Sequence, residues 1–166
     1  MADDARDRDD NPGVIAWPPA IAIATVLLGL ALDYVVPVYV LTVVFYFWTH
    51  VTLGVLLIAA GAALALAGTR AFRSVGTNVE PWLPSIRLAT DGIYRHIRNP
   101  MYVGLGLMVL GLGLALASDW TLVLLVPAAV VLHYGVVLRE EIYLEAKFGD
   151  EYRRFKQRVP RYGWPA

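Results

Sequence analysis

The sequence contains no cysteine, which excludes disulfide bonds, thiolate nucleophiles and metal sites that depend on cysteine ligands. Histidine is scarce as well: only 3 are present, His50, His96 and His133, and they lack the paired spacing of a helical zinc site. The chain also contains no P-loop and no GxSxG elbow. We therefore expect no metal site and no phosphate-binding loop of these kinds.

Charged residues are few. They make up 17% of the 166 residues, against 58% hydrophobic residues, whereas soluble domains average about a quarter charged. The 14 basic and 14 acidic side chains cancel to a net charge of zero, so the chain has no basic footprint for nucleic acid. The length allows a single domain, and the composition indicates that most of it lies in a lipid bilayer.

Long apolar runs are the dominant feature. Residues 18–36 form the first run, which Pro37 closes, and its length is close to the about 20 residues that span hydrocarbon. The second run, residues 38–67, is too long for one helix. Its aromatic-rich start predicts an interfacial segment over residues 38–48. A spanning helix is then expected over residues 50–68, with glycines that allow close packing against a neighbour.

Two further apolar runs, residues 101–117 and 120–138, are separated only by a Ser-Asp pair. They predict a tight transmembrane hairpin. Over residues 139–159 the pattern becomes amphipathic and predicts interfacial helices that are broken at Gly149. The expected fold is therefore all-α and integral to the membrane, with about four transmembrane helices, an interfacial segment and a C-terminal amphipathic helix.

The basic residues indicate an orientation for this fold. All 14 lysines and arginines lie in the N-terminal tail, in residues 70–98, or from residue 139 onward. Four spans bring these segments to the same side of the membrane, which the positive-inside rule makes cytosolic. We therefore expect both termini in the cytosol. Residues 1–13 are interpreted as a disordered acidic tail, and residues 14–166 as a single membrane domain.

The sharpest local motif is GIYRHIRNPMYVG, residues 92–104. One interpretation is structural: the segment is the interfacial start of the third apolar helix. Tyr94 and Tyr102 then lie at the headgroup level, and Arg98 extends toward lipid phosphates. Pro100 would occupy the first helical turn, where its missing N–H group is not needed.

The other interpretation of this motif is a ligand-binding loop. Exposed backbone N–H groups at the start of a helix attract carboxylates. Asn99 offers both a donor and an acceptor, while Gly104 and Gly106 allow a ligand to approach the backbone closely. The residues by themselves leave both interpretations open.

A second motif, Arg139-Glu140-Glu141, follows the fourth apolar run. It is either a solvated charge run at the membrane surface or part of a site. Adjacent helical positions point about 100° apart, so the two acids cannot share one role. One can face a ligand while the other pairs with Arg139 or with a loop arginine. His133 precedes Glu140 on the same predicted face, where a packed histidine is commoner than a catalytic one.

In chain order, a long polar loop, RNPMYVG, an apolar hairpin, EE and FGDEYRRFKQRVPR follow one another. This order resembles the isoprenylcysteine carboxyl methyltransferase and phospholipid N-methyltransferase superfamily, whose members are small helical membrane enzymes that use S-adenosylmethionine (SAM). The resemblance covers residues 77–161, and the first two helices carry no signature. It implies that residues 69–106 and 133–161 form a cofactor pocket on the cytosolic side.

The resemblance also implies which residues hold SAM. Residues 86–89 resemble a segment whose backbone contacts the nucleoside, and Tyr94 resembles an aromatic contact beside it. Residues 99–102 match the family's NPxY element, while Glu140 matches the glutamate that holds SAM. The residues assigned to the cofactor in this way are Ile86, Arg87, Leu88, Ala89, Tyr94, Asn99, Pro100, Met101, Tyr102, Gly104, Gly106 and Glu140.

The acceptor side of the expected site is less defined. Candidates to orient or deprotonate a lipophilic acceptor are Arg98, Arg139, Glu141 and His133. Val136 stands where the eukaryotic carboxyl methyltransferases have an arginine that engages the substrate carboxylate. That position therefore does not support a prenylcysteine carboxylate as the substrate.

Several functions remain open on the sequence. A SAM-dependent enzyme of this kind would act on a lipophilic acceptor, a phospholipid amine or a small thiol. Asn99 replaces the titratable histidine of the eukaryotic carboxyl methyltransferases. An NADPH-dependent reductase like the membrane sterol reductases would need arginines for the 2′-phosphate, and a non-catalytic membrane protein would bind neither cofactor. The expected partners are the bilayer and a lipid-like acceptor, with no nucleic acid and no metal.

Overall fold

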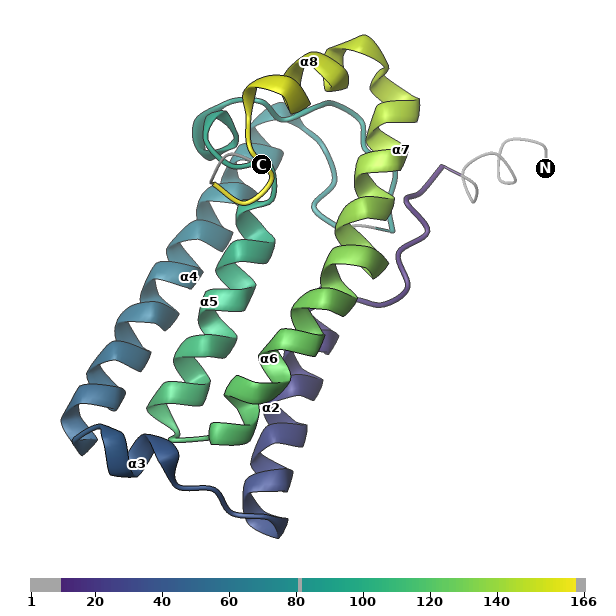
Figure 1. The fold of residues 1–166 in the computed structure, drawn as a ribbon. Helices are drawn as coiled ribbons and strands as arrows, with labels where there is room; N and C mark the ends of the chain where they lie inside the picture. The colour runs from purple at the N-terminus through teal and green to yellow at the C-terminus, as the bar shows by residue number, and fades with distance from the viewer. Residues whose placement is uncertain (1–9, 81, 164–166) are drawn as a thin grey trace.

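The computed structural model describes residues 10–80 and 82–163, and within them every regular element is helical (Figure 1). Residues 1–9 of the predicted acidic tail lie outside the described residues. The elements include one 3₁₀-helix, η1, and one π-helix, η2. In chain order they are α2 (Pro18–Val35), α3 (Val40–Val44), α4 (Phe47–Val75), η1 (Gly92–Arg95), α5 (Pro100–Ala115), α6 (Asp119–Leu132), η2 (His133–Val137), α7 (Leu138–Phe148) and α8 (Asp150–Arg158).

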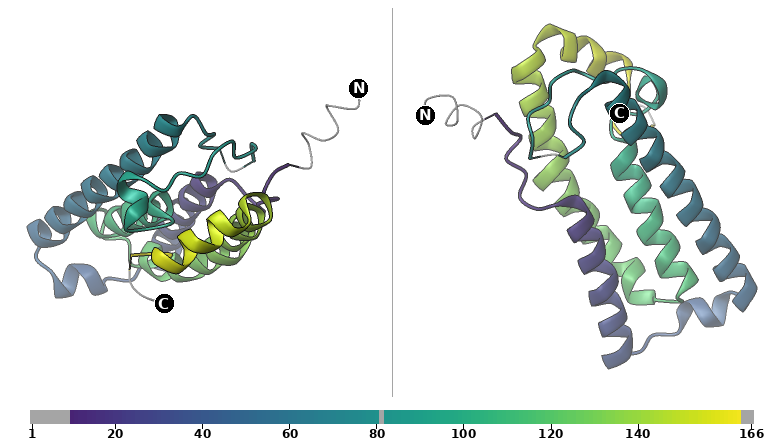
Figure 2. Two further views of the ribbon diagram at one scale, coloured as in Figure 1. Left: turned by 90° about the horizontal axis from the view of Figure 1, so that it is seen from above. Right: turned by 180° about the vertical axis from the view of Figure 1, so that it is seen from behind.

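Three helical stretches are long and apolar enough to cross a membrane: Pro18–Val35, Phe47–Val75 and Asp119–Phe148. α5 has 16 residues and extends about 24 Å at about 1.5 Å per residue. A hydrocarbon core is about 30 Å thick, so α5, which packs against α4 and α6 (Figure 2), is shorter than this core and shorter than each of the three long stretches. The helical membrane architecture is thus confirmed, whereas the count of four spans stays a prediction.

α4 is longer than predicted at both ends. It runs over Phe47–Val75, whereas the sequence predicted a helix over residues 50–68. Residues 69–75 contain neither proline nor glycine, so the helix continues to Gly76, whose φ of 70° provides a left-handed cap. The interfacial segment predicted over residues 38–48 shortens to α3 and the turns that flank it.

α4 and α5 approach each other closely because glycines face across their interface. A Cβ atom at Gly61 would lie 2.4 Å from the carbonyl oxygen of Gly104, and one at Gly111 would lie 2.6 Å from that of Gly54. Small residues at helix crossings are typical of membrane helix pairs. The packing role predicted for the glycines of α4 is confirmed, and Gly104 is one of their partners.

Gly61→Leu is expected to push α4 and α5 apart. The added side chain would meet the Gly104 carbonyl and Met108, and overpacking costs about 1–3 kcal/mol or more. We expect a lower midpoint of thermal unfolding in detergent micelles, measured by near-ultraviolet circular dichroism. Ala59→Leu, at an exposed position of the same helix, is the matched control and should leave the midpoint unchanged. Equal midpoints for the two variants would contradict this packing.

α6, η2 and α7 form one helical stretch over Asp119–Phe148. The π-helical η2 in its middle inserts an extra residue, and such insertions occur frequently at functional sites. The backbone N–H of Ile15 donates to the Gly135 carbonyl at 3.1 Å. This contact attaches the chain before α2 to η2. The extra residue also rotates the faces of α7 relative to those of α6.

The predicted tight hairpin between α5 and α6 is confirmed. Ser118 is the N-cap of α6, and its hydroxyl donates to the carboxylate of Asp33 on α2. Trp120 Nε1 donates to the carbonyl of Val36 at 2.7 Å, and Asp119 accepts from the backbone N–H of a residue in α3 at 3.2 Å. These contacts tie α2 and α3 to the hairpin at the end of the bundle remote from α8 (Figure 1).

The opposite end of the bundle carries the loop of residues 77–91, η1, α7 and α8 (Figures 1 and 2). α7 and α8 meet at Gly149, whose φ is 54°, so the predicted break is confirmed. α8 turns Tyr152 and Phe155 inward, and both are buried. Every lysine and arginine of the described residues lies on an element at this end. Which side of the membrane this end faces stays a prediction.

The described part of the predicted tail, residues 10–13, lies against α7. The carboxylate of Asp10 accepts from the Tyr143 hydroxyl at 2.9 Å and pairs with Lys147 at 2.5 Å. The hydrogen bond from Lys147 lowers the pKa of Asp10. Arg139 donates to the Gly13 carbonyl at 2.8 Å. The residues just before the first apolar run are thus held on α7.

Candidate functional site

A cavity of about 780 Å³, counted with its opening, lies among the 77–91 loop, η1, the start of α5, α7 and α8. Its wall is mostly apolar and contains a few polar groups. The lining residues are Pro12, Phe72, Thr77, Asn78, Val79, Glu80, Leu83, Ser85, Arg87, Leu88, Ala89, Tyr94, Arg98, Asn99, Met101, Tyr102, Glu140, Glu141, Tyr143, Leu144, Tyr152 and Phe155.

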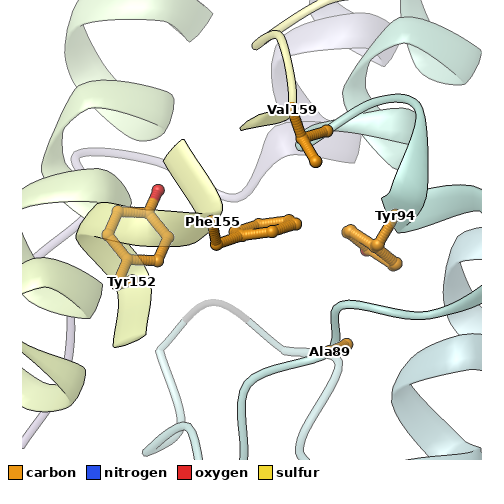
Figure 3. Close-up of a cluster of buried hydrophobic side chains, with 5 residues drawn as sticks. All are labelled: Ala89, Tyr94, Tyr152, Phe155 and Val159. Carbon is orange, nitrogen blue, oxygen red and sulfur yellow. The ribbon is translucent and has the colours of Figure 1, made fainter. Parts of the chain in front are cut away.

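A hydrophobic cluster forms one wall of this cavity. Ala89, Tyr94, Tyr152, Phe155 and Val159 come from the loop, η1, α8 and the chain after α8. Figure 3 shows the side chains of Phe155 and Tyr94 directed toward each other. Because all five are buried, the cluster fastens α8 over η1 and the loop.

Two tyrosines of the wall are held in their neutral form. The Tyr94 ring stacks on Phe72 with centroids 5.1 Å apart. Burial, and then the charge of Glu140, raise the pKa of Tyr94 far above its ordinary value. Burial raises the pKa of Tyr152 to about 12, and the charge of Glu141 adds to this effect. Both phenols are therefore hydrogen-bonding or packing groups at neutral pH and not bases.

The 77–91 loop is held in place by hydrogen bonds to side chains. Thr77 Oγ1 accepts from the backbone N–H groups of Ile86 at 2.9 Å and Arg87 at 3.3 Å. The Tyr143 hydroxyl of α7 accepts from the backbone N–H of Ser85 at 3.0 Å. The part of the loop that lines the cavity is thus anchored both to its own beginning and to α7.

Glu140 faces the cavity and, unlike Glu141, has no ionic partner among the described residues. The Tyr102 hydroxyl on α5 donates to Glu140 Oε1 at 2.5 Å, which is a short, charge-assisted hydrogen bond. No ion pair among the described residues includes Glu140. A carboxylate removed from water is unfavourable without a cation beside it. The cavity therefore suits a ligand that carries a positive charge.

Glu141 points away from Glu140 and into an ion cluster. Arg98 Nη1 lies 2.7 Å from Glu141 Oε1, and the side chains of both residues are only 8% exposed. Arg161 donates to both oxygens of Glu141, at 2.7 and 2.8 Å, and these hydrogen bonds raise the pKa of Arg161. The two acids thus have separate partners, as their angular separation on a helix predicted. Arg139 pairs with neither acid and is exposed.

The ion cluster secures the C-terminal strap, which we define as residues 159–163. Arg98 donates from its backbone to Pro160 at 3.0 Å and from Nε to Val159 at 2.9 Å. Asn99 donates to the Arg161 carbonyl from its backbone at 3.2 Å and from Nδ2 at 3.3 Å. The strap therefore lies across the start of α5, next to the cavity.

Comparison with known proteins identifies the family. The family model described as phospholipid methyltransferase matches residues 49–151, which is more than half of the chain. The chain belongs to the phospholipid methyltransferase family. This assignment agrees with the resemblance to the isoprenylcysteine and phospholipid methyltransferases described above.

Curated relatives align with shorter stretches of the chain. A protein-S-isoprenylcysteine O-methyltransferase of Schizosaccharomyces pombe is 34% identical over 73 residues, which is 44% of this chain and 31% of that protein. The aligned part is thus less than a third of the length of the yeast protein. An uncharacterized protein of Haemophilus influenzae is 42% identical over 62 residues, which is 37% of this chain and 98% of that protein. No solved structure matches significantly.

The family match reaches further toward the N-terminus than the sequence resemblance did. It begins at residue 49, within α4, and ends at residue 151, within α8. The expectation that the first two predicted helices carry no signature was therefore wrong for α4. α2, α3 and the C-terminal strap lie outside the matched residues.

Most residues assigned to the cofactor line the cavity. Arg98 and Glu141, which were candidates for the acceptor, also line it but are engaged with each other. The roles of all these residues stay predictions. The cavity-lining residues among those assigned to the cofactor are Arg87, Leu88, Ala89, Tyr94, Asn99, Met101, Tyr102 and Glu140.

Four residues assigned to the cofactor do not line the cavity: Ile86, Pro100, Gly104 and Gly106. Ile86 is 60% exposed, and its backbone N–H is bound by Thr77. Pro100 is buried in the first turn of α5, where its missing N–H group costs little. Gly104 faces Gly61 of α4. At Pro100 and Gly104 the structural interpretation of the motif accounts for the residue.

A second, apolar groove lies between α2, α5 and α6. It measures about 1,530 Å³, counted with the space open to its surroundings. Tyr102 lines both this apolar groove and the cavity. Gly106 and His133 also line the groove, and His133 Nδ1 lies 2.6 Å from the Tyr162 hydroxyl. His133 and Glu140, predicted on one helix face, are separated by the turn of η2 and line different spaces.

Several groups that shape the site were not predicted from the sequence. Thr77 and Tyr143 hold the loop, and Arg161 completes the ion cluster. Arg161 is the last residue of the C-terminal motif, which ends in RVPR. The motif marked this arginine but did not indicate its partner. The spacing of residues along the chain could not predict that the C-terminal strap returns to α7.

Proposed function

We propose that this protein is a methyltransferase that transfers a methyl group from SAM to a lipophilic acceptor at the cytosolic face of the membrane. The observation that carries the proposal is the state of Glu140. Its carboxylate lines the cavity, is held by Tyr102, and has no ionic partner among the described residues. SAM is positively charged at its sulfonium and at its amino group, so it would supply a cationic partner for Glu140.

The other walls of the cavity suit the remainder of SAM. The stacked rings of Phe72 and Tyr94, beside Leu88 and Ala89, offer an apolar surface for an adenine ring. The 77–91 loop is already held by Thr77. A preformed wall lowers the entropy that is lost on binding, which supports the loop as part of the cofactor site.

SAM supplies an electrophilic methyl group on a positively charged sulfur, and methyl transfer is a single in-line displacement. The main contribution of the chain is then to hold the reacting atoms about 3–3.5 Å apart. Glu140 and Tyr102 would hold the charged centre. Tyr152 and Phe155 of α8 would cover the cavity and keep water out.

The cavity end of the bundle is assigned to the cytosol. Every lysine and arginine of the described residues lies on elements at this end, and basic residues favour the cytosolic side of a membrane. SAM would then bind from the aqueous phase and the acceptor would arrive from the bilayer. Both termini would lie on the cytosolic side.

Binding and transfer measurements test this proposal. The protein in lipid nanodiscs is titrated separately with SAM and with NADPH in a calorimeter, and then incubated with methyl-labelled SAM and native lipid extract. We expect SAM to bind, NADPH not to displace it, and label to appear in a lipophilic product. Arg95→Gln is the control, because Arg95 and its exposed partner Asp91 do not line the cavity.

The same titration identifies the alternatives. Binding of NADPH in preference to SAM would replace the proposal with a reductase. Binding of neither cofactor would indicate a non-catalytic membrane protein. Either result would overturn the proposed function without affecting the family assignment.

A further inference from the structure

The apolar groove meets the cavity at a single aromatic side chain. Tyr102 lines both spaces, and its hydroxyl is bound to Glu140 on the cavity side. A molecule in the groove can therefore come closest to a ligand in the cavity beside Tyr102. Gly106, one helical turn further along α5, lines the groove and has open space where a Cβ atom would be. The groove thus continues from Tyr102 along α5.

The groove offers nothing that would neutralise a charged ligand. No lysine, arginine, aspartate or glutamate is among the described residues that line it. Burying a charged carboxylate or phosphate in such surroundings is strongly unfavourable. The reactive group of a molecule in this groove must therefore be uncharged when it arrives, while its body is apolar.

A hydrogen-bonded pair, His133 and Tyr162, lies at the Tyr102 end of the groove. His133 Nδ1 and the Tyr162 hydroxyl are 2.6 Å apart, and both residues line the groove. Tyr162 follows Arg161, whose carbonyl is bound by Asn99, three residues before Tyr102. When Nδ1 donates to the tyrosine oxygen, Nε2 of the imidazole has a free lone pair. Such a ring is oriented to accept a proton.

We propose that the acceptor is a hydrophobic thiol or phenol that lies in the apolar groove, and that His133 accepts its proton. The inference rests on the proposed SAM-dependent function. The acceptor sulfur or oxygen forms a bond to the methyl carbon, and the bond from that carbon to the sulfonium sulfur breaks with its electron pair staying on sulfur. The acceptor proton moves to His133 Nε2. The products are the methylated acceptor, S-adenosylhomocysteine and an imidazolium that releases its proton to water.

The restriction to thiols and phenols follows from acidity. Their ordinary pKa values are about 8.5 and about 10, so an imidazole can assist their ionisation. Alkyl hydroxyl groups are far less acidic. A lipid carboxylate is already ionised and would enter a groove without a cation. Tyr162 is a positioning residue in this scheme, because it acts on the acceptor only through His133.

A pair of acceptors with the same chain tests the head group. 1-Dodecanethiol and dodecanoate are each incubated with the protein in nanodiscs and methyl-labelled SAM. We expect label transfer to the thiol at least about 10-fold faster than to the carboxylate. Equal or faster transfer to dodecanoate would overturn the inference, as would SAM binding without transfer to the thiol. Failure of wild-type protein to bind SAM would instead overturn the proposed function on which the inference rests.

A substitution that fills the groove tests its location. Gly106→Leu adds a side chain into open space, so the fold should tolerate it. We expect the KM for 1-dodecanethiol to rise at least about 10-fold while the Kd for SAM stays within about 2-fold of wild type. Ala59→Leu, exposed on α4, should change neither value. An unchanged KM in Gly106→Leu would show that the acceptor does not use this groove.

His133→Asn tests the proton acceptor. We expect kcat for 1-dodecanethiol to fall about 100-fold, the lower range for loss of a general base, with unchanged SAM affinity. 4-Cyanophenol is more acidic than 1-dodecanethiol but still mostly uncharged at neutral pH, so it depends less on a base and the same variant should lose less than about 5-fold with it. An equal loss with both acceptors would mean that His133 only supports the structure, and this result would overturn its assignment as base.

Discussion

Replacing Glu140 with glutamine is expected to weaken SAM binding about 30-fold without unfolding the protein. Glutamine has nearly the same size and can still accept the hydrogen bond from Tyr102, so the cavity wall keeps its shape. The negative charge opposite the cofactor is lost. Removing one partner of a desolvated charge pair costs at least about 2 kcal/mol, and about 1.4 kcal/mol is a factor of ten in Kd. Calorimetric titration with SAM measures the effect.

The control for this prediction is the same substitution elsewhere on α7. Glu145 pairs with Arg153 and Lys156 at the surface, so Glu145→Gln should bind SAM like the wild type. Both variants should retain the thermal unfolding midpoint of the parent protein. Unchanged SAM affinity in Glu140→Gln would show that the Glu140 carboxylate does not contribute to cofactor binding. The proposed function would then lose its main support.

Replacing the adjacent acid has a different expected result. Glu141→Gln should lower the free energy of unfolding by about 3–5 kcal/mol, because removing one partner of a buried ion pair leaves the other charge uncompensated. Arg98 is the group most affected, since its side chain is only 8% exposed. Arg161 would also lose its partner, and the C-terminal strap would loosen from the start of α5.

Thermal and denaturant unfolding in detergent micelles measure this loss. Glu145→Gln again provides the comparison, because Glu145 forms only surface ion pairs, which contribute little to stability. Glu140→Gln provides a second comparison at the neighbouring position. A Glu141→Gln protein as stable as these two variants would contradict the ion cluster as the anchor of the strap.

The residues matched by the family model contain the central polar pair of the cavity but only part of the lining of the apolar groove. Tyr102 and Glu140, the central polar pair of the cavity, lie within the matched residues 49–151. The apolar groove takes part of its lining from α2 and from Tyr162, which lie outside that range. A family that shares a cofactor but acts on different acceptors would be expected to show this division. Acceptor specificity would then reside in segments that vary between members.

The helices could be predicted from the sequence because each depends on a local pattern. Run length and the Ser-Asp pair predicted α5 and α6 as a hairpin, and Gly149 predicted the break before α8. The error in the predicted end of α4 also came from a local pattern. The polar residues 69–75 were expected in a loop, yet α4 continues through them because no glycine or proline interrupts it before Gly76. Polarity marks the end of a membrane span but not the end of a helix.

The site was only partly predictable, for a different reason. The η2 turn adds a residue that no pattern in the apolar sequence marked, so His133 and Glu140 were expected on one face and instead line separate spaces. Gly104 was expected to approach a ligand, whereas it packs on α4. In both cases the local sequence was compatible with either outcome, and packing against another helix selected one.

The two adjacent acids, Glu140 and Glu141, illustrate what the sequence determines and what only the tertiary structure determines. The sequence by itself determined that the chain is a helical membrane protein with basic residues gathered in a few segments, and that Glu140 and Glu141 point in different directions. Helical periodicity could not determine which acid faces the cavity, although the family resemblance assigned Glu140 to the cofactor. The tertiary structure decided this. The C-terminal strap packs against α7 and brings Arg161 to Glu141, which also contacts Arg98. Glu140 instead accepts a hydrogen bond from Tyr102. Helical periodicity sets the direction of a side chain, but its partners come from segments far away in the chain, and the lowest-energy pairing of buried charges exists only once those segments have packed together.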